Sequence, residues 1–255
     1  MSELIRIETA DRVTTITFAR SEKKNALTPA MYEAVATALR QADQSSACRV
    51  VVVRGEDGVF TAGNDLGSFL QEPPKDTDTP VFRFLQAISG FGKPVIAAVD
   101  GHAVGVGTTM LLHCDLVYAS PRAKFRLPFV DLAVPPEAAS SYLLPRLVGP
   151  QRAAELLFFA EAFDARTAYQ LGIVNQIVDA ETLYQHAAER AAKLAAKPPG
   201  ALQICKQLLR AGTAELVAET MLSEGELFVE RLTSPEAIEA FTAFMQKRAP
   251  DFSKF

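Results

Sequence analysis

The sequence predicts an α/β protein that ends in a helical segment. Up to about residue 178, short apolar runs typical of strands alternate with amphipathic helical patterns. Beyond that point strand patterns stop, and helical patterns interrupted by proline and glycine continue to the C-terminus. Strands that alternate with helices are typical of a sheet covered by helices. We therefore expect a core over residues 1–195 and a C-terminal helical segment over residues 196–255.

The first expected elements are two strands, a helix and a third strand. Residues 4–8 and 13–18 alternate apolar and polar side chains across a short polar break, which predicts a hairpin. Thr28 and Pro29 predict a helix start, because threonine caps helix N-termini and proline fits the first helical position. The continuous valine run at residues 50–53 predicts a strand that is covered on both faces.

Two glycine-rich turns follow, each after a predicted strand. The segment FTAGNDL (residues 60–66) follows the valine strand, and GHAVGVG (residues 101–107) follows a strand expected at residues 94–99. Small residues let backbone N–H groups face a cleft, and a helix N-terminus adds positive potential. Two converging amides can stabilise an oxyanion. Taken alone, both segments also fit ordinary strand-to-helix turns.

The remaining elements continue the alternation and then end it. A helix is expected at residues 81–88, and a second one from the GHAVGVG turn to about His113. A strand is expected at residues 116–119, and the last good strand pattern covers residues 173–178. His102 and His113 are lone histidines, so we expect both to be structural.

Bulk composition excludes several classes of protein. The chain has 255 residues, is 49% hydrophobic and carries a net charge of −4, which fits a globular protein and argues against a nucleic-acid binder. No run approaches the ~18 apolar residues of a membrane span, and the charged N-terminal stretch offers no apolar core for a secretory signal. Three widely spaced cysteines fit neither a metal site nor a disulfide pattern. We expect no metal, no membrane and a cytoplasmic location.

Three common catalytic motifs are missing. In GVGTTM, Met110 stands where a dinucleotide fingerprint needs its third glycine. The chain has no GxSxG sequence for a nucleophilic serine and no HExxH sequence for zinc. The two glycine-rich turns therefore point to neither dinucleotide binding nor a serine nucleophile.

Four motifs, in this order along the chain, resemble the crotonase (enoyl-CoA hydratase/isomerase) superfamily. They are KKNAL at residues 23–27, FTAGNDL, GHAVGVG with CDLVYAS, and the tail FMQKRAPDF. The resemblance runs from about residue 5 to residue 255. It implies a spiral of β-β-α units with C-terminal helices that build a homotrimer or a dimer of trimers. It also implies an acyl-CoA thioester substrate, with coenzyme A as part of that substrate and no separate cofactor.

The resemblance also implies individual site residues. The two oxyanion-hole amides fall on Ala62 and Val106. Lys247, with Lys23, Lys24 and Arg248, is a candidate for the CoA phosphates, although plain surface charge explains these cations about as well. The full set expected to bind substrate is Lys24, Asn25, Ala26, Leu27, Gly63, Asn64, Asp65, Leu66, Phe129 and Lys247.

The positions of the carboxylates separate the subclasses of this family. Hydratases carry two glutamates at positions that match Thr109 and Phe129 here, and neither residue is acidic. Addition of water needs both carboxylates, one to activate water and one to handle the proton on carbon 2. Residues 127–149 instead resemble Δ3,Δ2-enoyl-CoA isomerases of the peroxisomal type, whose single catalytic glutamate falls on Glu137. Ala138 and Ala139 replace the glycine and small residue usual after it.

Glu137 is therefore the expected base of a double-bond shift from a 3-enoyl-CoA to a trans-2-enoyl-CoA. Asp131 is the rival base. Without the resemblance, Glu137 also fits a solvated carboxylate in the first turn of a helix. Two other functions stay open, since fold alone does not decide function. One is another crotonase-type reaction, such as hydratase or thioesterase chemistry, and the other is non-catalytic acyl-CoA binding.

Overall fold

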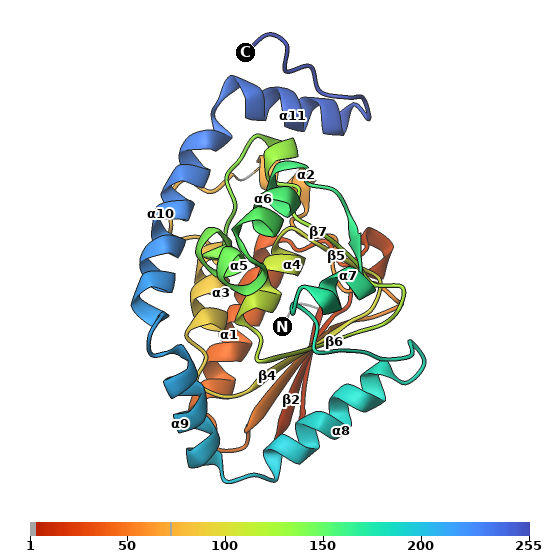
Figure 1. Ribbon diagram of the computed structural model, residues 1–255, viewed down its shortest axis with the longest axis vertical. Helices are drawn as coiled ribbons and strands as arrows, with labels where there is room; N and C mark the ends of the chain where they lie inside the picture. Colours follow the sequence, from red (N-terminus) through yellow and green to blue (C-terminus); the bar gives the residue numbers. More distant parts are fainter. Residues whose placement is uncertain (1–3, 72) are drawn as a thin grey trace.

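A six-stranded sheet forms the centre of the fold (Figure 1). The computed structural model describes residues 4–71 and 73–255, with the backbone alone described for residues 69–71. The sheet has the order β1-β2-β3-β4-β6-β9, in which β1 is antiparallel to β2 and every other neighbouring pair is parallel. Its strands are β1 (Ile5–Ala10), β2 (Val13–Phe18), β3 (Val50–Gly55), β4 (Val95–Val99), β6 (Leu116–Ala119) and β9 (Gln176–Ile177).

A second, smaller sheet makes the chain a spiral. It consists of β5 (His102–Val104), β7 (Lys124–Arg126) and β8 (Phe163–Asp164), in the order β5-β7-β8. Strand β5 directly follows β4, and β7 directly follows β6, so these two turns of the chain each add one strand to each sheet. This is the arrangement expected of β-β-α units. The sequence did not predict these three strands, because two or three residues are too few to show an alternating pattern.

Helices cover both faces of the large sheet, which explains the unbroken valine run in β3. Val51 and Val53 pack toward α1 (Pro29–Gln44) and α3 (Pro80–Ser89), whereas Val50 and Val52 pack against α8 (Leu183–Ala195). Successive side chains of a strand point to opposite faces, so both sets are buried. Burial of each valine side chain contributes about 1.5–3 kcal/mol.

The hairpin, the first helix and the strand at residues 116–119 are confirmed. Thr28 caps α1, since its side chain accepts a hydrogen bond from the Met31 N–H at 3.3 Å. The helix predicted from the GHAVGVG turn to His113 is not one continuous α-helix in the structure. It is one α-helical turn, α4 (Val106–Thr109), followed by the 3-10 helix η2 (Met110–His113). The last strand is β9, which is shorter than expected.

The second half of the chain is mainly helical, as predicted. A 3-10 helix, η3 (Val130–Leu132), precedes α5 (Ser140–Val148), α6 (Pro150–Phe158) and α7 (Ala165–Gln170). The last three helices are α9 (Pro199–Arg210), α10 (Ala214–Leu232) and α11 (Pro235–Met245). Helix α10 runs along the core beside α5, and α11 turns across its end, over η3 (Figure 1). Lys206 ties α9 to the core, because its Nζ donates to the Lys93 carbonyl at 2.6 Å and to Asp115 Oδ2 at 2.8 Å.

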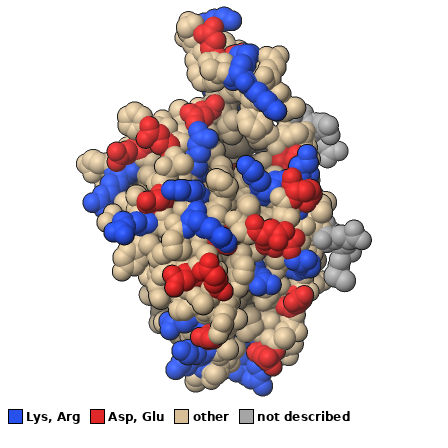
Figure 2. All heavy atoms as spheres, turned by 90° about the vertical axis from the view of Figure 1, so that its right-hand side faces the viewer, with Lys and Arg blue, Asp and Glu red and all other residues tan. Residues whose placement is uncertain are grey.

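The surface carries charges of both signs. On the face shown in Figure 2, acidic and basic side chains are interspersed rather than gathered into separate regions. Among the residues that the structure describes, no helix combines the length and the apolar character needed to cross a bilayer.

Candidate active site

A cavity of about 1080 Å³ brings together both glycine-rich turns, Glu137 and the C-terminal helices. The FTAGNDL turn contributes Asn64 and its neighbours, and the GHAVGVG turn contributes Gly105. Phe129 lies before η3, and Phe241 comes from α11. Segments from both ends of the chain therefore meet at this cavity, and most of the predicted site residues line it.

Glu137 is a buried carboxylate on the cavity wall. Only 6% of the residue is exposed, and within the described part of the chain its Oε1 has no hydrogen-bond partner. It precedes α5 rather than standing in its first turn, so the alternative of a solvated helix-start carboxylate is wrong. Burial raises the pKa of Glu137 to about 8, and the negative charge of Glu224 adds to this effect. A carboxylate with a pKa near neutrality is suited to general-base catalysis.

The turn after Glu137 has an uncommon backbone. Ala138 and Ala139 have φ angles of 62° and 53°, in the left-handed region, and both are buried. For residues other than glycine this region costs about 1–3 kcal/mol each. The two alanines thus hold a left-handed turn without the usual glycine. Ser140 secures it, because its Oγ donates to the Glu137 carbonyl at 2.6 Å.

The predicted oxyanion donor Ala62 is not available. Its backbone N–H donates to the Lys24 carbonyl at 2.9 Å. Two residues further on, the Asn64 N–H has no acceptor among the described residues. Asn64 forms a parallel bridge with Leu27, whose N–H donates to Gly63 and whose carbonyl accepts from Asp65. That pairing turns the Asn64 N–H to the opposite side of the segment, away from Leu27. Within the described residues, Asn64 rather than Ala62 therefore offers a free amide in the FTAGNDL turn.

On the neighbouring turn, the Val106 N–H also has no acceptor among the described residues, although Val106 is fully buried and stands outside the cavity lining, next to Gly105. It is the first residue of α4, where a backbone N–H has no partner within the helix. The two turns lie side by side, since Thr61 pairs with Ala103 in a parallel bridge. A Cβ atom on Gly63 would lie 2.6 Å from the Val104 carbonyl oxygen, so only glycine permits this approach. Asn64 and Val106 are thus the pair of amides that fits an oxyanion hole.

Side chains that the sequence did not single out hold the Asn64 turn in place. The Tyr32 hydroxyl of α1 donates to Asn64 Oδ1 at 2.5 Å. Arg20 pairs with Asp65 at 2.6 Å, and the other oxygen of Asp65 accepts from the Ser68 N–H at the start of α2 (Leu66–Gln71). The Tyr32–Asn64 and Arg20–Asp65 contacts link residues 32 and 45 positions apart along the chain, so no local sequence pattern indicates them.

Most of the predicted substrate-binding residues line the cavity, but three do not. Those that do are Lys24, Ala26, Gly63, Asn64, Asp65, Leu66 and Phe129. Asn25 is fully buried and holds its loop instead: it accepts from the Arg20 N–H at 2.8 Å and donates to the Val59 carbonyl at 2.7 Å. Leu27 is also buried and lies beside a neighbouring cavity.

The cations around the cavity differ in their availability. Lys247 is exposed and lies outside the cavity lining, whereas Arg248 lines it. Both terminal guanidinium nitrogens of Arg248, however, donate hydrogen bonds to Glu239. Lys23 and Lys24 are exposed at the cavity, and no ion pair is recorded for either among the described residues. Lys23 and Lys24 are therefore the better candidates for a phosphate contact.

The rival base Asp131 has a different environment from Glu137. Its side chain lines the same cavity but is 47% exposed, and it accepts a hydrogen bond from Arg126 at 2.6 Å. Asp131 is thus a paired and partly solvated carboxylate, whereas Glu137 is buried and its Oε1 has no partner among the described residues. Neither hydratase position offers a substitute, because Phe129 puts an apolar ring in the cavity and Thr109 is fully buried.

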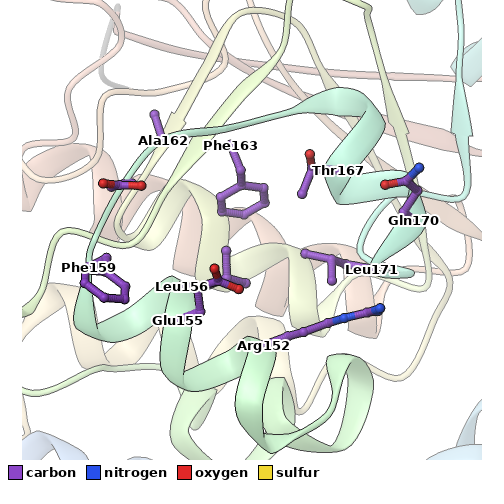
Figure 3. Close-up of a pocket in the computed structure, with 10 residues that line it drawn as sticks. Arg152, Glu155, Leu156, Phe159, Ala162, Phe163, Thr167, Gln170 and Leu171 are labelled. Carbon is purple, nitrogen blue, oxygen red and sulfur yellow. The ribbon is translucent and has the colours of Figure 1, made fainter.

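A second cavity, of about 590 Å³, lies between α6 and α7 (Figure 3). Arg152 and Glu155 of α6 and Thr167 and Gln170 of α7 contribute its polar groups. It shares no lining residue with the cavity around Glu137, and neither glycine-rich turn reaches it. We therefore place the candidate active site in the cavity around Glu137.

The enoyl-CoA hydratase/isomerase family model matches residues 8–254. OdaA of Pseudomonas aeruginosa has a similar structure, with a TM-score of 0.93 and 46% identity over 96% of this chain and 99% of that one. This chain belongs to the enoyl-CoA hydratase/isomerase family.

Similar proteins with known names do not agree on the reaction. Enoyl-CoA delta isomerase 2 of Rattus norvegicus is 33% identical over 97% of this chain, and the chain spans 64% of the length of that relative. The 2,3-dehydroadipyl-CoA hydratase of Escherichia coli is 34% identical over 99% of both chains. Because the identities are nearly equal, the reaction has to be argued from the residues of the site.

Proposed function

We propose that this protein is a Δ3,Δ2-enoyl-CoA isomerase that converts 3-enoyl-CoA to trans-2-enoyl-CoA. The observation that carries the proposal is Glu137, a buried carboxylate whose Oε1 has no hydrogen-bond partner among the described residues and which lines the same cavity as Asn64 and Gly105. A double-bond shift needs one base and an oxyanion hole. Hydration needs a second acid, and Thr109 and Phe129 supply none.

The proposed reaction moves one proton. The thioester oxygen accepts hydrogen bonds from the Asn64 and Val106 amides, and the Glu137 carboxylate removes a proton from carbon 2. The electron pair of the broken C–H bond spreads over carbon 2, carbon 4 and the thioester oxygen, where the amides stabilise the charge. Glu137 then returns the proton to carbon 4, which leaves the double bond between carbons 2 and 3. Both transfers use the same carboxylate, so the proposed shift needs no metal or redox cofactor.

Product analysis with three substrates tests this function. The protein is incubated separately with a 3-enoyl-CoA, a trans-2-enoyl-CoA and a saturated acyl-CoA, and products are identified by mass and by ultraviolet absorbance of the conjugated thioester. We expect conjugated 2-enoyl-CoA from the first substrate, and little hydration or hydrolysis of the others. Rapid gain of water by the 2-enoyl-CoA would assign the protein to the hydratases, and release of free CoA would assign it to the thioesterases.

The pH dependence of the reaction should report the buried base. Glu137 must be deprotonated to act, and burial raises its pKa to about 8. The value of kcat/KM is therefore expected to rise about tenfold per pH unit below pH 8 and to level off above it, as for a single essential base. The measurement is kcat/KM for a 3-enoyl-CoA from pH 5.5 to 9.5. A profile that is flat through this range would contradict a base with a raised pKa.

We also propose that the chain forms a trimer or a dimer of trimers. Helix α9 leaves large apolar side chains in solvent: Ile204 is 59% exposed, Leu208 71% and Leu209 80%. Contiguous apolar surface of this kind marks a protein–protein contact. Sedimentation equilibrium at micromolar concentration is expected to give a mass of three or six chains. A mass of 27.6 kDa, which is that of one chain, would refute the proposal.

A further inference from the structure

We propose that Glu224 of α10 is a positioning residue for Glu137: it holds the left-handed turn that follows the base and so fixes where the base points. This inference rests on the isomerase function proposed above. Glu224 does not line the cavity and has no assigned contact with substrate. It acts on the reaction through the backbone between Glu137 and α5.

Both oxygens of Glu224 bind the turn. Oε2 accepts from the Ala139 N–H at 2.6 Å, and Oε1 accepts from the Ser141 N–H at 2.8 Å. Glu224 is only 5% exposed, so these are the bonds of a desolvated carboxylate. Burial raises the pKa of Glu224, and the hydrogen bonds from the Ser141 and Ala139 N–H groups oppose that rise because they stabilise the ionised form.

The turn needs such an anchor because its backbone is strained. Ala138 and Ala139 both adopt left-handed φ angles, and alanine keeps them only where its surroundings impose them. His113 of η2 holds the turn from another side: its Nε2 lies 2.8 Å from the Ala138 carbonyl oxygen. A carbonyl oxygen only accepts, so this ring nitrogen carries the proton. Glu137 is thus followed by a segment whose peptide groups are fixed by α10 and η2.

Glu224 also influences the base through its charge. Its negative charge opposes ionisation of Glu137, and this adds to the effect of burial in raising the pKa of Glu137. The other ionisable side chains around the base and its turn come from several elements. They are Tyr32 of α1, His113 of η2, Asp131 of η3, and Lys23, Lys24, Asp65, His102, Arg126 and Arg248 on the cavity wall. Of these groups and Glu224, only Glu224 donates or accepts at both Ala139 and Ser141.

The test compares Glu224→Gln with Glu226→Gln. Glu226 lies on the same helix but is exposed, so it controls for the loss of one negative charge on α10. In Glu224→Gln the side-chain oxygen still accepts a hydrogen bond from one of the two N–H groups. The side-chain NH₂ faces the other N–H and cannot accept from it, and the negative charge is lost. We expect kcat for the 3-enoyl-CoA to fall about 10–100-fold, the cost of a misplaced catalytic group. KM should stay near that of the wild type, and the midpoint of the kcat/KM profile should move to lower pH. Glu226→Gln should change none of these.

A second variant covers the case in which Glu224→Gln does not fold. Glu224→Asp keeps the charge but withdraws the carboxylate by one carbon from both N–H groups. We expect a lower kcat with a pH midpoint close to that of the wild type. Folding is checked by circular dichroism and by CoA affinity. Wild-type kcat in either folded variant would overturn the proposal, and so would a loss of the same size in Glu226→Gln.

A measurement that needs no turnover distinguishes failure of the proposal on Glu224 from failure of the proposed isomerase function. The titration of the Glu137 carboxyl is followed by ¹³C NMR in protein labelled at glutamate side-chain carbons, with Glu137→Gln to assign the signal. Glu224→Gln should lower the midpoint of this titration, and Glu226→Gln should leave it in place. If the wild type does not isomerise 3-enoyl-CoA, the proposed function fails while this result still decides the role of Glu224. An unchanged midpoint in a folded Glu224→Gln protein would refute the effect of Glu224 on the base.

Discussion

Replacement of Glu137 by glutamine is expected to lower the rate of 3-enoyl-CoA isomerisation by ~10²–10⁴-fold, the usual contribution of a general base. Glutamine keeps the size and shape of the side chain but accepts no proton at neutral pH. The Glu137 side chain has no hydrogen bond in the described structure to hold the fold, so folding and CoA affinity should stay near those of the wild type. The measurement is the rate of conjugated-product formation, with CoA affinity determined in parallel.

Asp131→Asn is the matched comparison for this experiment. Asp131 is a carboxylate of the same cavity, but it is half exposed and paired with Arg126. Its replacement should therefore retain substantial turnover. The opposite pattern, with turnover lost in Asp131→Asn and kept in Glu137→Gln, would reassign the base to Asp131. If neither variant changed the rate, the one-base mechanism would have to be abandoned.

The second large effect is expected at Val106, where the backbone rather than the side chain is proposed to act. Val106→Pro removes the amide hydrogen and should lower kcat by ~10²–10³-fold, the cost of one oxyanion-hole donor. Val106 is the first residue of α4, a position at which proline fits a helix without breaking it. The comparison is the kcat of the proline variant against that of Val106→Ala, which keeps the N–H and should retain most activity.

Folding has to be checked in both Val106 variants, because the valine side chain is fully buried. Thermal unfolding and CoA affinity show whether each protein is intact. Equal losses of kcat in two folded variants would indicate that the side chain matters and the amide does not. That result would remove Val106 from the oxyanion hole and leave Asn64 as the remaining candidate donor.

The sequence predicted the long elements of this fold and missed the short ones for a physical reason. Helix α1 has a threonine cap and apolar residues at helical spacing, and β3 is a run of valines, so local patterns suffice for both. Strands β5, β7 and β8 have two or three residues each and exist because the chain passes beside an earlier turn. Such pairing depends on contacts between distant residues, which no local pattern records.

In the candidate site too, local motifs predicted some features, and contacts between distant residues determined the others. The motifs located the two turns, but they did not indicate which amide of FTAGNDL is free. Which amide is free depends on how this turn pairs with residues 24–27. The pairing occupies the Ala62 N–H and leaves the Asn64 N–H without an acceptor among the described residues. The contribution of Glu224 could not be foreseen either, because 83 residues separate it from Ser141. A glutamate in a helical pattern is most often a solvated surface residue.

An oxyanion hole made of main-chain amides places few demands on the residues that form it. Every amino acid except proline supplies the same N–H, so the donors proposed at positions 64 and 106 depend on the backbone path and not on the chemistry of the side chain. A few acidic side chains around these amides then determine which reaction the thioester undergoes. Relatives can therefore diverge in chemistry by gaining or losing one carboxylate while overall identity hardly changes. A hydratase and an isomerase at nearly equal identity to this chain are what such a scaffold leads us to expect.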